Sequence, residues 1–224
     1  MRASPIHQVG RVIRHVGNKL LTLSSVKGIW IDVGAHHGDV TIGYARHNPG
    51  LTIYAFEPNL SAAATLIGRA PNYFVLPMAV AETDGTAELH LNAFDAASSL
   101  LPFNEHTLKS WVGGDSLKVV SKVSVPTIRL DTFMTMMKID KVNFLKIDTQ
   151  GMDLSVVKSA GKRLSSIAKI TLEVDVTPTR LYSGAPSKDE VVAFLREAGF
   201  SLVASEVQSH GQEENMTFVM AGQK

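Results

Sequence analysis

The sequence has 224 residues, of which 45% are hydrophobic and 19% are charged. Its 22 basic and 21 acidic residues give a net charge of +1, which excludes a strong overall field for nucleic acid or an anionic membrane. The chain has no cysteine, so disulfides, thiolate metal sites and a cysteine nucleophile are excluded. We therefore expect a globular cytoplasmic domain without a membrane span.

The first 28 residues form an N-terminal segment, distinct from the main domain of residues 29–224. Arg11, Arg14 and Lys19 separate apolar residues at helical spacing, which predicts an amphipathic helix. The apolar positions are Ile6, Val9, Ile13, Val16 and Leu20. This helix either covers the core or provides a self-association face, which leaves a homodimer open; a basic helix on a membrane surface is the alternative.

From residue 29 the sequence alternates between short apolar runs and helical segments. We expect strands at residues 29–33, 52–56 and 74–80, with helices at 41–46 and 61–67 between them. Strands and helices that alternate at this spacing indicate right-handed crossovers and a parallel sheet covered on both faces.

The middle of the chain has a different pattern. Residues 86–92 and 118–130 alternate between apolar and polar side chains, which predicts strands with one buried and one more solvent-exposed face. Residues 93–116 lie between them and show no regular periodicity. A stretch of this length inside a domain is usually functional or mobile, so we interpret it as a candidate lid.

The α/β pattern then resumes with strands at 143–148 and 168–174 and helices at 153–160 and 187–198. The last two strands, residues 201–207 and 216–220, follow each other without a helix and should pair as an antiparallel hairpin. The predicted fold is a doubly wound, seven-stranded α/β sheet that ends in this hairpin.

Candidate cofactor-binding residues stand where the first two strands end. In open α/β sheets, ligands bind beyond the carboxyl ends of the strands. Glycines in the first turn let a ligand approach the backbone, and an acid after the second strand can accept hydrogen bonds from both hydroxyls of a ribose. The pattern therefore predicts a nucleoside cofactor. The residues are Asp32, Gly34, Ala35, His36, Gly38, Glu57 and Pro58.

The loop sequence discriminates between two nucleoside cofactors. A nicotinamide fingerprint requires G-x-G-x-x-G for the pyrophosphate, whereas His36 and Asp39 occupy the second and third glycine positions. S-adenosylmethionine carries a sulfonium and no phosphate, and it gains from a nearby carboxylate such as Asp32. The loop therefore favours S-adenosylmethionine over NAD.

Several segments together carry a family resemblance. They are Ile31–Gly38, Ala55–Asn59, Ala79–Gly85, Ser98–Leu100, Thr127–Asp131, Phe144–Gly151 and Leu172–Val174. On these segments the sequence resembles the FkbM family of S-adenosylmethionine-dependent methyltransferases, with Lys146-Ile147-Asp148-x-x-Gly151 as the most diagnostic element. The resemblance implies a Rossmann-like methyltransferase sheet. It also implies O-methylation of a hydroxyl on a sugar, a glycolipid or a polyketide-type natural product.

The sequence departs from the family pattern at two positions. His36 stands where the family often has Asn, and Gln150 stands where it often has Glu. The second departure removes a negative charge beside the expected acceptor site, so residue 150 is not expected to act as a base or a metal ligand.

Methyl transfer to a hydroxyl requires alignment of the reacting atoms and benefits from a base. Asp148, at the carboxyl end of the fourth strand, is the candidate base or acceptor-orienting residue and is also counted with the cofactor-binding set. The alternatives are that it pairs with Lys146 or caps the next helix. His37 is the second catalytic candidate, because imidazole titrates near neutral pH.

Three further residues are assigned to the cofactor. Thr41 either caps the helix after the glycines or touches the methionine tail. Ala79 lies at the end of the third strand, and Ser98 lies in the irregular segment, where the alternative is a plain turn residue.

A divalent metal is considered but not favoured. Its oxygen ligands would be Asp148 and Glu173, with Asp175 or Asp153. Asp153 also fits the first turn of a helix, where an acid is favoured by the helix dipole.

Two other functions remain as alternatives, an NAD-dependent oxidoreductase and a non-catalytic nucleoside-binding domain. The expected partner is a small-molecule or glycan hydroxyl acceptor. A nucleic-acid substrate is not expected, because the main domain lacks clustered Lys and Arg to engage phosphates.

Overall fold

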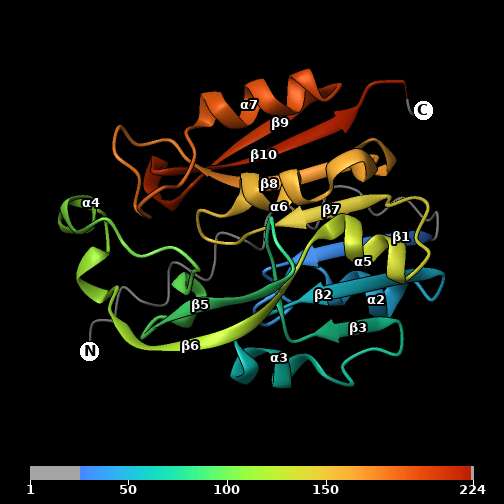
Figure 1. Ribbon diagram of the computed structural model, residues 1–224, viewed down its shortest axis with the longest axis horizontal. Helices are drawn as coiled ribbons and strands as arrows, with labels where there is room; N and C mark the ends of the chain where they lie inside the picture. Colours follow the sequence, from blue (N-terminus) through green and yellow to red (C-terminus); the bar gives the residue numbers. More distant parts are fainter. Residues whose placement is uncertain (1–25, 223–224) are drawn as a thin grey trace.

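The computed structural model describes residues 26–222, in which a seven-stranded sheet runs in the order β3-β2-β1-β7-β8-β10-β9 (Figure 1). The predicted helix over residues 6–20 lies outside the described residues. The strands are β1 (Gly28–Val33), β2 (Leu51–Phe56), β3 (Tyr73–Leu76), β7 (Phe144–Ile147), β8 (Lys169–Asp175), β9 (Phe200–Gln208) and β10 (Glu213–Met220).

Neighbouring strands from β3 to β8 pair in parallel, and β10 pairs antiparallel with both β8 and β9. The predicted doubly wound sheet with a terminal antiparallel hairpin is confirmed. Figure 1 shows that β1, β2 and β7 point toward the same side of the molecule. The residues that follow these three strands are therefore neighbours in space.

Helices cover both faces of the sheet. They are α2 (Ile42–His47), α3 (Leu60–Leu66), α5 (Leu130–Met136), α6 (Asp153–Ser159) and α7 (Lys188–Glu197). Helix α7 begins with a capping box, in which Ser187 and Glu190 satisfy each other's backbone N–H groups, and Gly199 follows the helix at a φ of +90°. These signals are local, which is why the sequence predicts the helix well.

Successive side chains of β2 point to opposite faces of the sheet, and each face packs into a separate hydrophobic core. Ile53 and Ala55 pack with residues of α2 and α3 on one face. Phe56 faces the opposite side, where its ring meets that of Phe133 on α5 edge-on at 4.9 Å. The second core continues through α6 and α7, and it contains the larger share of the buried hydrophobic residues.

The strand expected over residues 74–80 is wrong in its extent. β3 ends at Leu76, and Ala79–Val80 form a separate strand, β4, in a second sheet of order β4-β6-β5. Pro77 stands between the two and lacks the N–H that a continuing ladder would require. The predicted strands on either side of residues 93–116 are confirmed as β5 (Gly85–Asn92) and β6 (Val119–Ile128).

The segment between β5 and β6 is more regular than the sequence predicts. It contains η2 (Asp95–Ala97), α4 (Glu105–Ser110) and η3 (Gly114–Ser116), and the Asn104 side chain caps α4. Backbone pairing joins Phe103 to Tyr182, and the Asn104 N–H donates to the Leu181 carbonyl at 2.7 Å. In this structure the candidate lid is therefore attached to the segment that follows β8.

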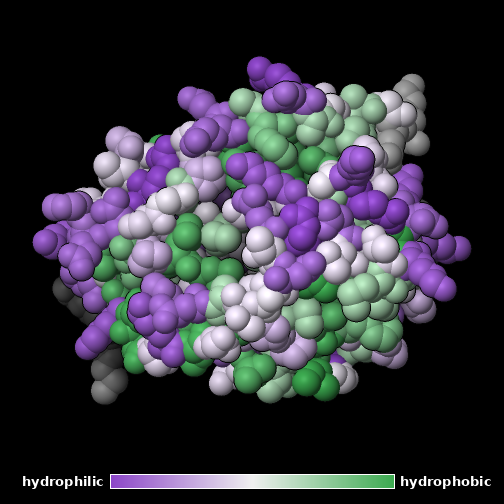
Figure 2. Space-filling view, in the orientation of Figure 1, coloured by the Kyte–Doolittle hydropathy of each residue, from purple (hydrophilic) through white to green (hydrophobic). Residues whose placement is uncertain are grey.

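Exposed hydrophobic side chains are found at both ends of α3, where Leu60 and Ile67 flank the helix. Figure 2 shows hydrophobic residues along the lower edge of the molecule, where α3 lies in Figure 1. Among residues 26–222, no helix is long and apolar enough to cross a membrane.

Candidate active site

The glycine loop, residues 34–38, connects β1 to α2 at the carboxyl end of the sheet. Gly34 has a φ of +73°, and a Cβ there would lie 1.8 Å from the carbonyl oxygen of Asp148. The N–H groups of Gly34 and Ala35 both donate to the Phe56 carbonyl at 3.0 Å. Only glycine satisfies this position, because the turn requires the left-handed region and the carbonyl of Asp148, the residue after β7, leaves no room for a side chain.

Glu57 directly follows β2 and lies against the glycine loop. Its carboxylate accepts the backbone N–H of His36 at 2.7 Å and that of Asn59 at 2.9 Å. Burial raises the pKa of Glu57, although these two N–H groups oppose the shift. Each carboxylate oxygen uses one acceptor position on the backbone, so acceptor capacity remains for two hydroxyl donors.

Lys146 connects the glycine loop to the adjoining strand ends. Its ammonium donates to the Gly34 carbonyl at 2.6 Å and pairs with the buried Asp32 at 3.1 Å. It also lies 3.7 Å from Asp148. Burial disfavours the charged ammonium, but the carboxylates of Asp32 and Asp148 outweigh it and raise the pKa of Lys146.

Asp148 follows β7 and keeps 38% of its side chain exposed. Besides Lys146, its carboxylate accepts a hydrogen bond of 2.8 Å from the amide of Gln150. The cap role considered for the helix that follows is not observed, since α6 begins without a side-chain cap. Asp148 thus lies between a cation and an amide donor, and its remaining acceptor positions are open to a ligand.

Gln150 holds together the residues after β7. It has a φ of +56°, a conformation that non-glycine residues adopt rarely. Its amide nitrogen donates to Asp148 and, at 3.2 Å, to Glu173, while its amide oxygen accepts from the Tyr182 hydroxyl at 2.9 Å. The Ser99 hydroxyl donates to the Gln150 carbonyl at 2.7 Å. The amide at this position supplies donors that a glutamate would lack.

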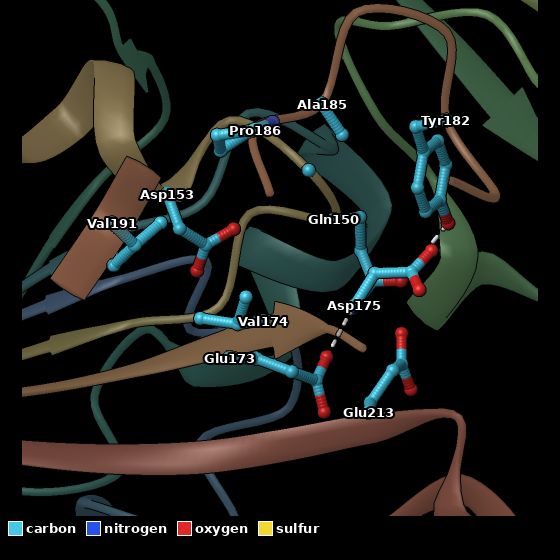
Figure 3. A pocket seen from close by; sticks show the side chains of 11 residues that line it. Gln150, Asp153, Glu173, Val174, Asp175, Tyr182, Ala185, Pro186, Val191 and Glu213 are labelled. Atoms are coloured by element: carbon cyan, nitrogen blue, oxygen red, sulfur yellow. Dashed lines mark hydrogen bonds between the residues drawn. The ribbon is translucent and has the colours of Figure 1, made fainter. Parts of the chain in front are cut away.

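A pocket opens beside Gln150, and we call it the carboxylate pocket. Figure 3 shows Glu173 and Glu213 below Gln150, with Tyr182 on the opposite side. Glu173 comes from β8 and Glu213 from the first residue of β10. The lining residues are Gln150, Gly151, Asp153, Glu173, Val174, Asp175, Tyr182, Ala185, Pro186, Val191 and Glu213.

Three of the pocket acids, Asp153, Glu173 and Glu213, have raised pKa values. Burial raises the pKa of Asp153 to about 7, and the charge of Asp148 adds to the shift. Burial likewise raises the pKa of Glu213 to about 7. The pKa of Glu173 is raised well above its ordinary value by burial and by the charges of Asp148 and Glu213. Near neutral pH the pocket can therefore both donate and accept protons.

The oxygen-ligand metal set considered from the sequence is only partly brought together. Glu173 and Asp153 line the carboxylate pocket, but both oxygens of Asp175 accept backbone N–H groups, from Thr177 at 2.8 Å and Leu181 at 2.7 Å. Asp175 therefore fixes the turn after β8.

Three residues that the sequence assigns to the cofactor make their contacts with other parts of the protein. Thr41 is buried and donates to Asp32, and its side chain does not cap α2, so the cap alternative is wrong. The Ser98 hydroxyl accepts the Asn92 N–H at 3.1 Å. Ala79 is buried in β4 of the second sheet, because the third strand ends earlier than predicted.

The two histidines of the glycine loop point toward one carboxylate. Nε2 of His36 lies 3.0 Å from Asp95 in η2, and Nε2 of His37 lies 3.4 Å from it. The His37 Nδ1 lies 3.2 Å from the Thr65 hydroxyl. The structure thus brings the two rings together rather than pointing them apart as adjacent loop residues usually do.

Tyr182, Glu213 and Asp95 were missed by the sequence reasoning. Tyr182 and Asp95 lie in connecting segments with no periodic pattern. Glu213 pairs in register with Asp175, so a correct alignment of β10 on β8 would have placed it. The predicted hairpin pairs β10 with β9 and does not say which residues of β8 it faces. The pairing with β8 arises because β10 lies between β8 and β9 in the sheet.

The fold and the strand-end residues define a class, that of the Rossmann-like methyltransferases. Fibrillarin from Aeropyrum pernix, solved with natively bound S-adenosyl-L-methionine, matches with a TM-score of 0.50 at 11% identity, over 88% of this chain and 67% of that one. Magnesium protoporphyrin IX methyltransferase from Synechocystis PCC 6803, solved with bound SAH, matches with a TM-score of 0.50 at 10% identity, over 99% and 90%. At sequence identities of 10–11%, these two structures are similar to this chain in their fold alone.

The sequence also matches the model of the methyltransferase FkbM domain over residues 32–202. The chain belongs to this family of methyltransferases, as the sequence motifs predicted. A comparison with curated proteins gives no significant match.

Proposed function

We propose that this protein is an S-adenosylmethionine-dependent O-methyltransferase whose acceptor is a hydroxyl on a small molecule or glycan. The observation that carries the proposal is the position of Asp148. Lys146 links it to the glycine loop, and Gln150 links it to the carboxylate pocket. A partly exposed carboxylate between these two regions is where an acceptor oxygen and a cofactor methyl group would meet.

The glycine loop and Glu57 fit the cofactor. The turn at Gly34 brings the His36 N–H to the Glu57 carboxylate, which retains acceptor capacity for both hydroxyls of a ribose. When bound, S-adenosylmethionine supplies an electrophilic methyl group. The residues proposed to hold it are Asp32, Gly34, Ala35, His36, Gly38, Glu57 and Pro58, with Thr41 acting through Asp32.

Asp148 would orient the acceptor and receive its proton. A hydroxyl is a weak nucleophile until its proton has an acceptor, and a carboxylate at hydrogen-bond distance supplies one. Lys146 and Gln150 hold the carboxylate in place, so little motion is needed in the reaction. His37 is the weaker candidate, because Asp95 and Thr65 occupy its two ring nitrogens.

The mouth of the carboxylate pocket would contact the acceptor, since the enclosed space of about 20 Å³ has room for about one water molecule. Glu173 and Glu213 present oxygens that accept hydrogen bonds, and Tyr182 provides an aromatic wall. These groups suit a molecule with several hydroxyls, such as a sugar, better than an apolar or anionic one. We therefore favour a polyhydroxylated acceptor of the kind found on sugars, glycolipids and polyketide-type natural products.

Isothermal titration calorimetry with S-adenosylmethionine tests the cofactor. We expect Glu57→Ala to weaken binding by at least tenfold, since two charge-assisted hydrogen bonds are lost. Glu88→Ala is the matched control, because Glu88 is exposed and pairs with Lys122 on the second sheet. Equal affinity in wild type and Glu57→Ala would contradict the assignment. Binding of NAD in place of S-adenosylmethionine would support the oxidoreductase alternative.

Mass spectrometry of reactions with a panel of hydroxylated sugars and polyketide fragments tests the transfer. The expected product gains one methylene unit in mass, and Asp148→Asn should reduce kcat by about 10²–10⁴-fold while leaving cofactor affinity within a few-fold. Asp140→Asn, at a fully exposed carboxylate, is the control. Cofactor binding without transfer to any acceptor would favour the non-catalytic nucleoside-binding domain.

A further inference from the structure

A group of nitrogen and oxygen ligands converges at the mouth of the glycine loop. Nε2 of His36 and Nε2 of His37 approach the two carboxylate oxygens of Asp95, at 3.0 and 3.4 Å. The two imidazole rings lie with their centroids 3.9 Å apart. These side chains come from two segments far apart in the sequence, the loop after β1 and the η2 turn after β5.

The hydrogen bonds around His37 assign its tautomer. The Thr65 hydroxyl donates to the Ala62 carbonyl at 2.8 Å, so it can only accept from Nδ1 of His37. Nδ1 of a neutral His37 therefore carries the proton, and Nε2 presents its lone pair toward Asp95. The Nε2 lone pair of His37 and the Asp95 carboxylate are both acceptors, and at 3.4 Å a cation between them would stabilise the pair.

The backbone aims the other imidazole at the same point. His36 has a φ of +48°, and its N–H is held by the Glu57 carboxylate at 2.7 Å. This left-handed turn lets two consecutive side chains face one carboxylate, which an extended or helical backbone would not allow. Nε2 of His36 is buried, whereas the side chains of His37 and Asp95 are 42% and 45% exposed, so an ion can enter from their side.

The donor set resembles those that bind transition metals. Zinc is bound by imidazole nitrogen and carboxylate oxygen at about 2.0–2.2 Å, which sets tetrahedral ligands about 3.3 Å apart. The observed nitrogen–oxygen distances are close to this spacing, and the ligand atoms of all three residues lie within 4.8 Å of one another. The Thr65 contact corresponds to the outer hydrogen bond that metal-binding histidines usually make.

We propose that His36, His37 and Asp95 bind a divalent transition-metal ion, with Zn²⁺ favoured, and leave one coordination position open. Imidazole donors select Zn²⁺ or Cu²⁺ over Mg²⁺ and Ca²⁺, which prefer oxygen ligands. The ion fastens η2 to the glycine loop and so ties the β5–β6 segment to the end of β1. This site is separate from the oxygen-only carboxylate pocket. It uses the His36 side chain, whereas the His36 backbone N–H contacts Glu57 of the proposed cofactor site.

Calorimetric titration of the chelator-treated full chain with ZnCl₂ tests the site. We expect saturable binding that Asp95→Asn, His36→Asn and His37→Asn each weaken by at least tenfold. Asparagine tolerates the left-handed backbone at position 36, so His36→Asn should keep the fold. His106→Asn, at an exposed histidine of α4, is the control and should bind zinc as the wild type does.

A second readout separates this site from adventitious binding to surface histidines. Co²⁺ at a tetrahedral site gives strong visible absorption, which we expect in the wild type and the His106→Asn variant and not in the Asp95→Asn variant. Absence of zinc binding would overturn the proposal. So would zinc affinity that is unchanged in all three ligand variants, or reduced as much by His106→Asn as by Asp95→Asn.

Discussion

The glycine loop and the carboxylate pocket both lie at the carboxyl end of the sheet, but they are assembled differently. The loop takes its backbone hydrogen bonds from Phe56 and Glu57, at the end of the strand that follows it in the chain and pairs directly with β1. The pocket takes its walls from β8, β10 and the segment that contains Tyr182. The first region tolerates almost no change in backbone, whereas the second depends on the balance of several buried charges.

The largest expected effect is at the glycine loop. In Gly34→Ala the new Cβ would lie 1.8 Å from the Asp148 carbonyl oxygen, and φ would remain left-handed. We expect the free energy of unfolding to fall by more than about 4 kcal/mol in urea titrations. Gly43→Ala is the control: no atom lies within 4 Å of that position in α2, and alanine favours a helix by about 1 kcal/mol. If both variants are equally stable, the loop is not sterically fixed.

Lys146 tests the link between the two regions. Lys146→Met leaves the buried Asp32 without its cation, so we expect a loss of about 3–5 kcal/mol in the free energy of unfolding. Lys122→Met should cost less than about 1 kcal/mol, because its pair with Glu88 is exposed. Adding Asp32→Asn to Lys146→Met should recover part of the loss; further destabilisation would show that the pair is not the cause.

The pocket should make stability depend on pH. Asp153 has a pKa of about 7 in the fold against an ordinary value of 3.8, so between these values the folded state binds more protons than the unfolded state. The free energy of unfolding contributed by this group therefore falls as pH rises from 4 to 7, by up to about 1.4 kcal/mol per pH unit.

Urea unfolding at several pH values within that window checks this prediction. The Asp153→Asn variant should lose this part of the slope, and the Asp140→Asn variant should keep the wild-type slope because Asp140 is exposed. Parallel pH profiles for wild type and Asp153→Asn would show that the buried carboxyl does not titrate in this range.

The smallest expected effect is at Gln150. Gln150→Glu replaces an amide donor between Asp148 and Glu173 with a third acid. We expect a loss of about 1–2 kcal/mol at pH 8 and a smaller loss at pH 5, where the new carboxyl can take a proton and donate it. Thermal unfolding at the two pH values measures the difference. An effect that does not change with pH would point to packing instead of charge.

The glycine loop and the carboxylate pocket also differ in how far the sequence predicts them. The turn at Gly34, the acid Glu57 and the helix over residues 187–198 depend on residues near one another in the chain, and the sequence predicts all three. The sequence places Lys146 in the family motif and beside Asp148, but its contact with Asp32 depends on the register between β1 and β7. Asp95 and Tyr182 could not be found, since their neighbours are fixed by long-range packing of segments that lack periodicity.

The position of β10 has a consequence for the order in which the molecule is completed during synthesis. Strands β8 and β9 leave the ribosome first, yet they do not pair with each other; β10 must enter between them. Glu213, its first residue, arrives with it. A nascent chain that has reached β9 holds every residue of the glycine loop, but it still lacks Glu213, one wall of the carboxylate pocket. Premature termination after β9 would therefore remove both the partner strand of β9 and one acid of the carboxylate pocket.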